Sequence, residues 1–161
     1  MEWPTTSQWH SGSGVPFLFE DLIVVVKSYM LSSSKIFVGT DSFVSKGKVT
    51  FATAICLHGG SKPSRYFFFK ENQNKKNYNN LSSRIIEEAR RSVELSSLLI
   101  TKFEIDAKDI ELHLDVSPQH LNNETSKFSS MLKGYISGYG IDCKMKPDAW
   151  ASQSVADRHS K

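Results

Sequence analysis

The sequence contains few cysteines, few residues that interrupt regular structure and no long apolar run. Its 161 residues include 2 Cys, 5 Pro and 9 Gly. Cys56 and Cys143 lie far apart and show no CxxC or His/Cys spacing, which argues against a zinc site and a disulfide framework. The apolar run at 22–26 is far shorter than the ~20 residues that cross a bilayer, and the polar start over 1–14 lacks the pattern of a secretory signal. We therefore expect a protein of the reducing cytoplasm with no membrane partner.

The sequence also lacks a strong excess of charge. Twenty Lys and Arg oppose 17 Asp and Glu, and the net charge of +3 identifies no partner. The charges are unevenly distributed, however: residues 62–91 hold 8 basic and 3 acidic side chains, whereas residues 93–115 hold 6 acidic and 2 basic ones. This pattern predicts a basic approach surface near an acidic centre.

The length and the hydrophobic fraction of 39% are typical of a single globular domain. Residues 1–16 are rich in Ser, Thr, Gly and Pro and predict a flexible N-terminal lead, which Trp3, Trp9 and Phe17 can anchor to the domain. The domain itself is predicted over residues 17–161.

Hydrophobic periodicity predicts an α/β domain. Helices are expected at 17–30 (where three valines also suit a strand), 81–100, 123–137 and 148–159, the last with Asp148 as its N-cap. Strands are expected at 35–40, 48–58, 65–70, 110–115 and 141–145. The first three strands form an antiparallel meander because only short turns join them, and the last two follow helical crossovers. The sequence therefore predicts a five-stranded mixed sheet in the order βββαβαβα, with helices on both faces and an extra N-terminal helix.

Three acidic residues stand at positions where a structural role does not require a charge. Asp41 follows the apolar strand 35–40, Asp115 ends the strand 110–115, and Glu88 lies on the apolar face of the helix 81–100. Crowded carboxylates repel one another unless a cation neutralises them, and hard oxygen ligands select Mg²⁺ or Mn²⁺. Two such ions can activate a water molecule and stabilise the leaving oxygen of a phosphodiester. Both aspartates are also compatible with simple turns.

The strings VGTDS, HLDVS, GYGIDCKMKPDAW and SVADRHSK, together with the βββαβαβα order, resemble the ribonuclease H-like superfamily and, within it, the YkuK-type family. The resemblance extends from about residue 17 to residue 161. It implies two-metal nuclease or phosphotransfer chemistry on nucleic acid, with Asp41 bridging both ions and Glu88 and Asp115 as further ligands. Asp157 matches the acid of the last helix, and Asp148 is the alternative.

Two departures from ribonuclease H proper concern the substrate. Ser42 and Phe43 follow Asp41 where that enzyme usually has glycine. No histidine lies between the fifth strand and the last helix, where ribonuclease H often carries one that shuttles protons. Lys146 occupies that segment, and we expect it to contact the scissile phosphate.

Several alternatives stay open at this point. Glu87 competes with Glu88 for the helix position, and Arg84 and Arg91 lie on the same helix face and could pair with the acid. The histidines show no metal-ligand spacing: His113 is interpreted as a strand residue without a catalytic role, and His58, His120 and His159 are unassigned. The aromatic run 66–69 is more typical of a core strand than of a base-stacking surface. Two basic sets could meet a phosphate backbone: Lys70, Lys75, Lys76, Arg90 and Arg91, and more weakly Lys127, Lys133, Lys144 and Lys146.

The sequence thus favours a nuclease that uses two Mg²⁺ or Mn²⁺ ions on nucleic acid. The alternative is a non-catalytic nucleic-acid-binding or scaffold protein with the same fold. The choice between RNA, DNA, hybrid and junction substrates and the oligomeric state are left open.

Overall fold

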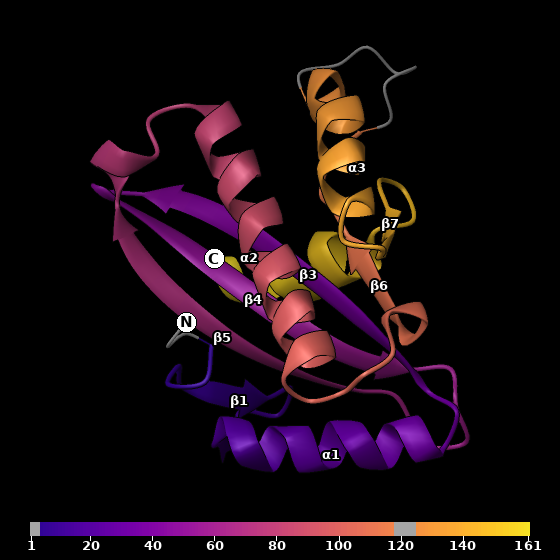
Figure 1. The fold of residues 1–161 in the computed structure, drawn as a ribbon. Coiled ribbons are helices and arrows are strands. Elements are labelled where there is room, and N and C mark those ends of the chain that lie inside the picture. The colour runs from indigo at the N-terminus through magenta and orange to yellow at the C-terminus, as the bar shows by residue number, and fades with distance from the viewer. Residues whose placement is uncertain (1–3, 118–124) are drawn as a thin grey trace.

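The computed structural model describes residues 4–117 and 125–161 (Figure 1). Trp3, His120 and residues 123–124 of the predicted third helix lie outside the described residues. The elements, in chain order, are β1 (Trp9–Ser11), β2 (Pro16–Phe17), α1 (Phe19–Leu31), β3 (Lys35–Ser45), β4 (Lys48–His58), β5 (Arg65–Asn74), α2 (Leu81–Thr101), β6 (Ile110–His113), α3 (Ser129–Ser137), β7 (Asp142–Lys144), the π-helical turn Ala151–Ala156 and α4 (Asp157–Ser160). Short 3₁₀ turns occupy Lys75–Asn77, Ala107–Asp109 and Ser126–Phe128.

One mixed sheet organises the molecule, with the strand order β2-β1-β5-β4-β3-β6-β7. β3, β4 and β5 form the predicted antiparallel meander, and β6 and β7 join it in parallel on the far side of β3. The five predicted strands and their mixed arrangement are therefore confirmed. The strand count differs because β1 and β2 extend the sheet beyond β5.

The meander strands are longer than the sequence predicted. β3 continues to Ser45 and β5 to Asn74, because both pair with β4 along nearly its whole length. A tight turn allows this extension, and Gly47 adopts a φ of 72° there. Asp41 consequently lies within β3, opposite Ala52, and not at the end of the strand. β6 is shorter than predicted and ends two residues before Asp115.

Helices cover both faces of the sheet, as predicted (Figure 1). The larger core lies between one face and α1, α2 and α3, and it includes Leu22, Ile36, Leu95 and Ile136. On the other face, residues 150–160 form a C-terminal helical run that packs on a smaller cluster with Ala54, Cys56 and Phe68. This run begins two residues later than predicted.

A glycine permits the close approach of the C-terminal helical run to the sheet. A Cβ atom placed on Gly39 would stand 2.5 Å from the backbone nitrogen of Ser152 and 2.6 Å from the carbonyl carbon of Ala151. Carbon atoms cannot approach backbone so closely, so a side chain at this position would push the run away from β3. The glycine in VGTDS therefore fixes how near the last helical segment lies to Asp41.

Part of the predicted flexible lead belongs to the sheet. Trp9 in β1 is fully buried, donates a hydrogen bond from Nε1 to the Pro4 carbonyl at 2.8 Å, and packs edge-on against Phe69. The division of the chain at residues 16 and 17 stays a prediction, although β1 and β2 on its N-terminal side are paired. No helix in residues 4–117 and 125–161 is both long and apolar enough to span a membrane.

Candidate functional site

Asp41 places a carboxyl group within the inner strand β3. Asp41 is only 7% exposed, because β4 pairs with β3 at this position and the C-terminal helical run packs on β3. The Ser160 hydroxyl donates to its Oδ2 atom at 3.2 Å. Burial raises the pKa of Asp41 to about 8, and repulsion by Asp115 and both hydrogen bonding and repulsion by Asp157 add to the effect. Without a cation, Asp41 is therefore mostly protonated at neutral pH.

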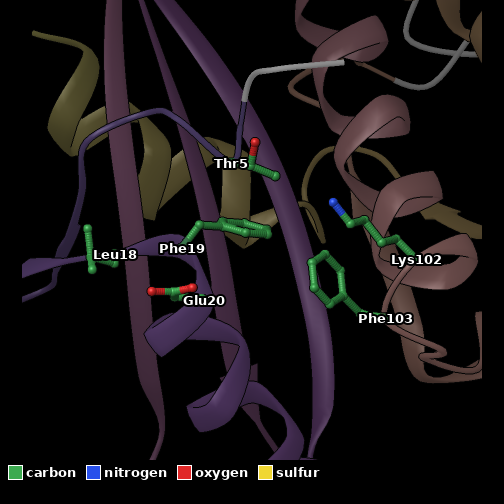
Figure 2. Close-up of a pocket in the computed structure, with 6 residues that line it drawn as sticks. All are labelled: Thr5, Leu18, Phe19, Glu20, Lys102 and Phe103. Carbon is green, nitrogen blue, oxygen red and sulfur yellow. The ribbon is translucent and has the colours of Figure 1, made fainter.

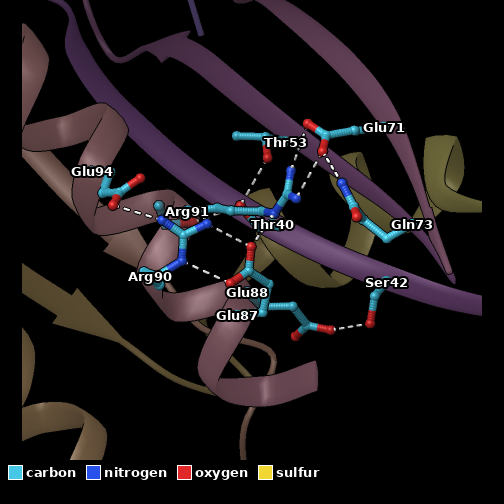
Figure 3. A network of polar contacts seen from close by, with 11 residues as sticks. Thr40, Ser42, Thr53, Glu71, Gln73, Glu87, Glu88, Arg90, Arg91 and Glu94 are labelled. Atoms are coloured by element: carbon cyan, nitrogen blue, oxygen red, sulfur yellow. Dashed lines mark hydrogen bonds and ion pairs between the residues drawn. The ribbon is translucent and has the colours of Figure 1, made fainter. Parts of the chain in front are cut away.

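Glu88 approaches Asp41 from the opposite face, on α2. The helix begins at a side-chain cap, where the Asn80 oxygen accepts from the Ser83 backbone N–H. Four residues advance an α-helix by about 6 Å and two residues advance a strand by about 6.6 Å, so every fourth residue of α2 can contact every second residue of β3. Ser42 donates to Glu88 at 2.5 Å (Figure 3). One helical turn later, Thr40 and Ser92 share a hydrogen bond of 2.8 Å.

The environment of Glu88 disfavours a negative charge. Burial raises its pKa well above the ordinary value, and repulsion by Asp41 and Asp115 acts in the same direction, while the Ser42 hydrogen bond and Arg84 oppose it. The neighbouring Glu87 is held differently, in an ion-pair network beside the site (Figure 3).

That network separates the two glutamates that the sequence left unresolved. Glu87 accepts from Arg90 at 2.7 Å and from Arg91 at 2.7 Å, and Arg91 also pairs with Glu71 on β5 at 3.3 Å. Burial alone would raise the pKa of Glu87, but the hydrogen bonds and charges of the two arginines outweigh it and lower the pKa. Glu87 is thus committed to the arginines, and Glu88 faces the other acids.

The same contacts change the interpretation of one basic set. Arg90 pairs with Glu87 and Glu94, and Arg91 is buried between carboxylates with its guanidinium 4.6 Å from the ring centroid of Phe51. These two arginines are therefore engaged within the fold. The exposed members of that set are Lys70, Lys75 and Lys76.

Asp115 and Asp157 complete the cluster, and each is paired with a lysine. Lys146 Nζ lies 2.9 Å from Asp115 Oδ1, and Lys161 Nζ lies 3.3 Å from Asp157 Oδ2. Asp157 extends from the first turn of α4, whereas Asp115 follows β6. Asp148, the alternative to Asp157, is exposed in a bend, and among the described residues no contact of its side chain with another acid is found.

The structure therefore brings together Asp41, Glu88, Asp115 and Asp157: Asp115 and Asp157 help to raise the pKa of Asp41, and Asp41 and Asp115 help to raise that of Glu88. Carboxylate oxygens are the donors that Mg²⁺ and Mn²⁺ prefer, so the chemistry of the set fits such ions. Within residues 4–117 and 125–161, however, no three His, Cys, Asp or Glu side chains are arranged to hold one metal ion. One oxygen of each acid already has a partner in the protein: Ser160 for Asp41, Ser42 for Glu88, Lys146 for Asp115 and Lys161 for Asp157.

No pattern in the sequence indicates the two serines, Ser42 and Ser160, that hydrogen-bond to the acids. Both interactions depend on tertiary contacts, across 46 residues for Ser42 and Glu88 and across 119 for Ser160 and Asp41. The one local relation is the three-residue spacing between Asp157 and Ser160, about one helical turn, which places these two residues on the same side of the last helix.

His113 has a structural position on the same face as Asp41. Its Nδ1 accepts the Ala151 backbone N–H at 3.0 Å, so the ring proton is on Nε2, which contacts Glu111 at 2.9 Å. Burial lowers the pKa of His113, against the opposing effect of Glu111. The neutral imidazole thus connects β6 to the start of the C-terminal helical run.

A surface cavity of about 380 Å³ lies between the start of α1 and the end of α2, lined by Thr5, Leu18, Phe19, Glu20, Lys102 and Phe103 (Figure 2). Lys102 is fourteen residues beyond Glu88, about 21 Å along the helix axis. The cavity is therefore separate from the acid cluster.

The sheet order, with parallel strands added to the free side of β3, and the acids on β3, α2, the end of β6 and the last helix define a ribonuclease H-like domain. A family model described as Ribonuclease H-like matches residues 18–161, and the chain belongs to this family. The chain is also similar to the protein named "Uncharacterized protein YkuK" of Bacillus subtilis (strain 168). The two are 26% identical over 160 residues, which cover 89% of this chain and 91% of that protein. The resemblance deduced from the sequence strings agrees with both findings.

Proposed function

We propose that this domain hydrolyses phosphodiester bonds of nucleic acid with the help of two Mg²⁺ or Mn²⁺ ions. The observation that carries the proposal is the convergence of four carboxyl groups from separate elements, two of them with strongly raised pKa values. Buried acids that repel one another are stable as a set when a cation neutralises them. Membership of the ribonuclease H-like family supports nucleic acid as the substrate class.

Asp41, Glu88, Asp115 and Asp157 would hold the ions, with Asp41 between the other three. When bound, the ions would supply an activated water and stabilise the charge that develops on the leaving oxygen. The protein's own part is to position the carboxylates: Ser42 orients Glu88, Ser160 orients Asp41, and the α2–β3 register sets their separation. Lys146, at the rim of the cluster, would contact the scissile phosphate.

The test is cleavage in the presence of Mn²⁺ of single-stranded and double-stranded DNA, RNA, hybrid duplex and branched DNA, with mononucleotides as a further phosphoester. Asp41→Asn should abolish metal-dependent cleavage and retain the fold, since asparagine preserves the shape of the side chain. Asp148→Asn is the matched control and should cleave as the parent does. Equal cleavage by Asp41→Asn and the parent would refute the assignment.

A second function is favoured by the absence, among the described residues, of three side chains arranged around one ion. A binding or scaffold protein with this fold would use the exposed basic side chains at Lys70, Lys75 and Lys76 to contact a phosphate backbone. Calorimetric titration with Mn²⁺ separates the two functions: a folded protein that binds no Mn²⁺ but retains nucleic-acid binding would be a scaffold. For either function we expect a cytoplasmic location.

A further inference from the structure

The backbone fixes Lys146 beside Asp115. Parallel pairing continues past the ends of β6 and β7: the Leu114 N–H donates to the Lys144 carbonyl at 2.9 Å, and the Lys146 N–H donates to the Val116 carbonyl at 3.0 Å. The side chains of Asp115 and Lys146 therefore start from adjacent points. The lysine side chain remains 38% exposed, so its ammonium group can leave Asp115 without any change in the backbone.

The ammonium group occupies an oxygen that a metal ion would need. Lys146 Nζ lies 2.9 Å from Asp115 Oδ1, within hydrogen-bond distance. A divalent ion seeks the same lone pairs, and two cations cannot share them at contact distance because they repel each other. Lys161 has a similar relation to Asp157, but it is 59% exposed and its contact at 3.3 Å is longer.

We propose that Lys146 couples metal binding to phosphate binding: it is the resting counter-cation of Asp115, is displaced when a divalent ion binds, and then pairs with a phosphate group. This inference rests on the proposed function, because it requires a divalent ion at the acid cluster. It goes further in stating that the metal and the phosphate strengthen each other's binding through one side chain.

The coupling follows from the order of contacts. In the resting protein Lys146 neutralises Asp115, so the ion must compete with it. Once the ion holds Asp115, the displaced ammonium group lies beside the cluster, and an anion that binds there gains a cationic partner. By thermodynamic linkage, a phosphate that draws Lys146 away from Asp115 must strengthen metal binding by the same factor.

The experiment is calorimetric titration with Mn²⁺, with and without adenosine 5′-monophosphate, a phosphate carrier that has no phosphodiester bond to cleave. Lys146→Met is compared with Lys144→Met, which removes the same charge from an exposed position on β7 for which no ion pair is found within the described residues. Lys146→Met should bind Mn²⁺ about two- to fivefold more tightly than Lys144→Met, the factor expected from losing a partly exposed ion pair. The nucleotide should tighten Mn²⁺ binding in the parent and in Lys144→Met, and much less in Lys146→Met.

Lys146→Arg retains a cation at the same position and should keep both the parent's Mn²⁺ affinity and the effect of the nucleotide. Thermal unfolding of each variant shows whether it is folded. If all variants bind Mn²⁺ but Lys146→Met binds it no more tightly than Lys144→Met, the proposed coupling is wrong. The proposed metal site is supported in that case, because Mn²⁺ still binds. If neither the parent nor any folded variant binds Mn²⁺, the coupling and the metal-dependent function are both wrong.

Discussion

Replacing Asp41 by asparagine should stabilise the metal-free protein. Asp41 is buried in the sheet beside Asp115 and Asp157, and its pKa is raised from 3.8 to about 8. The unfolded chain releases the proton of this carboxyl group at low pH, whereas the folded protein retains it. Asparagine carries no proton that ionises, and it can still accept the Ser160 hydroxyl. The variant therefore removes an unfavourable contribution that grows with pH.

The sign and the size follow from proton linkage. Below pH 3.8 both states are protonated, and the carboxyl group does not affect stability. As the pH rises from 3.8 toward 8, the unfolded state binds fewer protons than the folded state, so the free energy of unfolding falls by about 1.4 kcal/mol per pH unit. Over the roughly three units up to pH 7 the loss is about 4 kcal/mol. Because an amide replaces only part of the carboxyl group's hydrogen bonding, we expect Asp41→Asn to gain about 2–4 kcal/mol at pH 7.

Urea unfolding of the parent and of Asp41→Asn in the presence of a chelator, at intervals from pH 4 to pH 8, measures the difference. Asp148→Asn serves as the control and should stay within about 0.5 kcal/mol of the parent, since Asp148 is exposed. Addition of Mg²⁺ should narrow the gap, because only the parent retains the full ligand set. A difference between parent and variant that does not increase with pH would refute the reasoning.

Three further predictions concern the surroundings of the cluster. Arg91→Met should lower the free energy of unfolding by about 2–3 kcal/mol, because it removes the buried guanidinium group between Glu87 and Glu71 and leaves Glu87 with Arg90 alone. Arg90→Met, at a more exposed position, should lower it by about 1 kcal/mol or less, and equal urea midpoints for the two variants would contradict this. Gly39→Ala should destabilise the protein by more than about 1 kcal/mol in thermal unfolding, because its Cβ would meet the backbone of the C-terminal helical run. Gly134→Ala is the control and should not destabilise it, since there is open space at that Cβ. A neutral Gly39→Ala would be evidence against the packing. His113 should make a contribution opposite in sign to that of Asp41, because below about pH 6.5 the unfolded chain takes up a proton that the buried ring resists. His113→Gln removes this contribution, so its free energy of unfolding should increase more steeply on acidification than that of the parent, and an unchanged pH dependence would argue against the role of the neutral ring.

Local patterns in the sequence single out three of the four predicted acids, and the resemblance to the ribonuclease H-like superfamily adds Asp157. Asp41 comes after the apolar segment 35–40, Asp115 comes after the alternating segment 110–114, and Glu88 shares a helix face with Ile85 and Leu95. These patterns arise because one face of each strand or helix is buried, and the spacing of apolar residues along the sequence reflects that burial. The same logic predicted the central sheet and the helices that cover it.

The features that the sequence missed depend on partners that are distant along the chain. The extension of β5 beyond Lys70 joins polar residues that read locally as a loop, and only pairing with β4 makes them a strand. The choice between Glu87 and Glu88 required the position of Arg91, which is set by Glu71 on β5. Trp9 lies in a segment whose composition indicates a lead, yet its indole packs against Phe69.

The position of Asp157 has a consequence for how the protein folds. The C-terminal helical run that carries Asp157 contacts β3, which lies over 100 residues earlier in the chain. The run is therefore synthesised after every other acid of the cluster. The sheet and its larger core do not include this run, so they can form while Asp41 still faces water on one side. Docking of residues 150–160 would cover that side of Asp41 and bring Asp157 to it. Transient undocking of the same segment would expose Asp41 and release Asp157 without unfolding the sheet, so backbone amides in the run should exchange with solvent faster than those of β4.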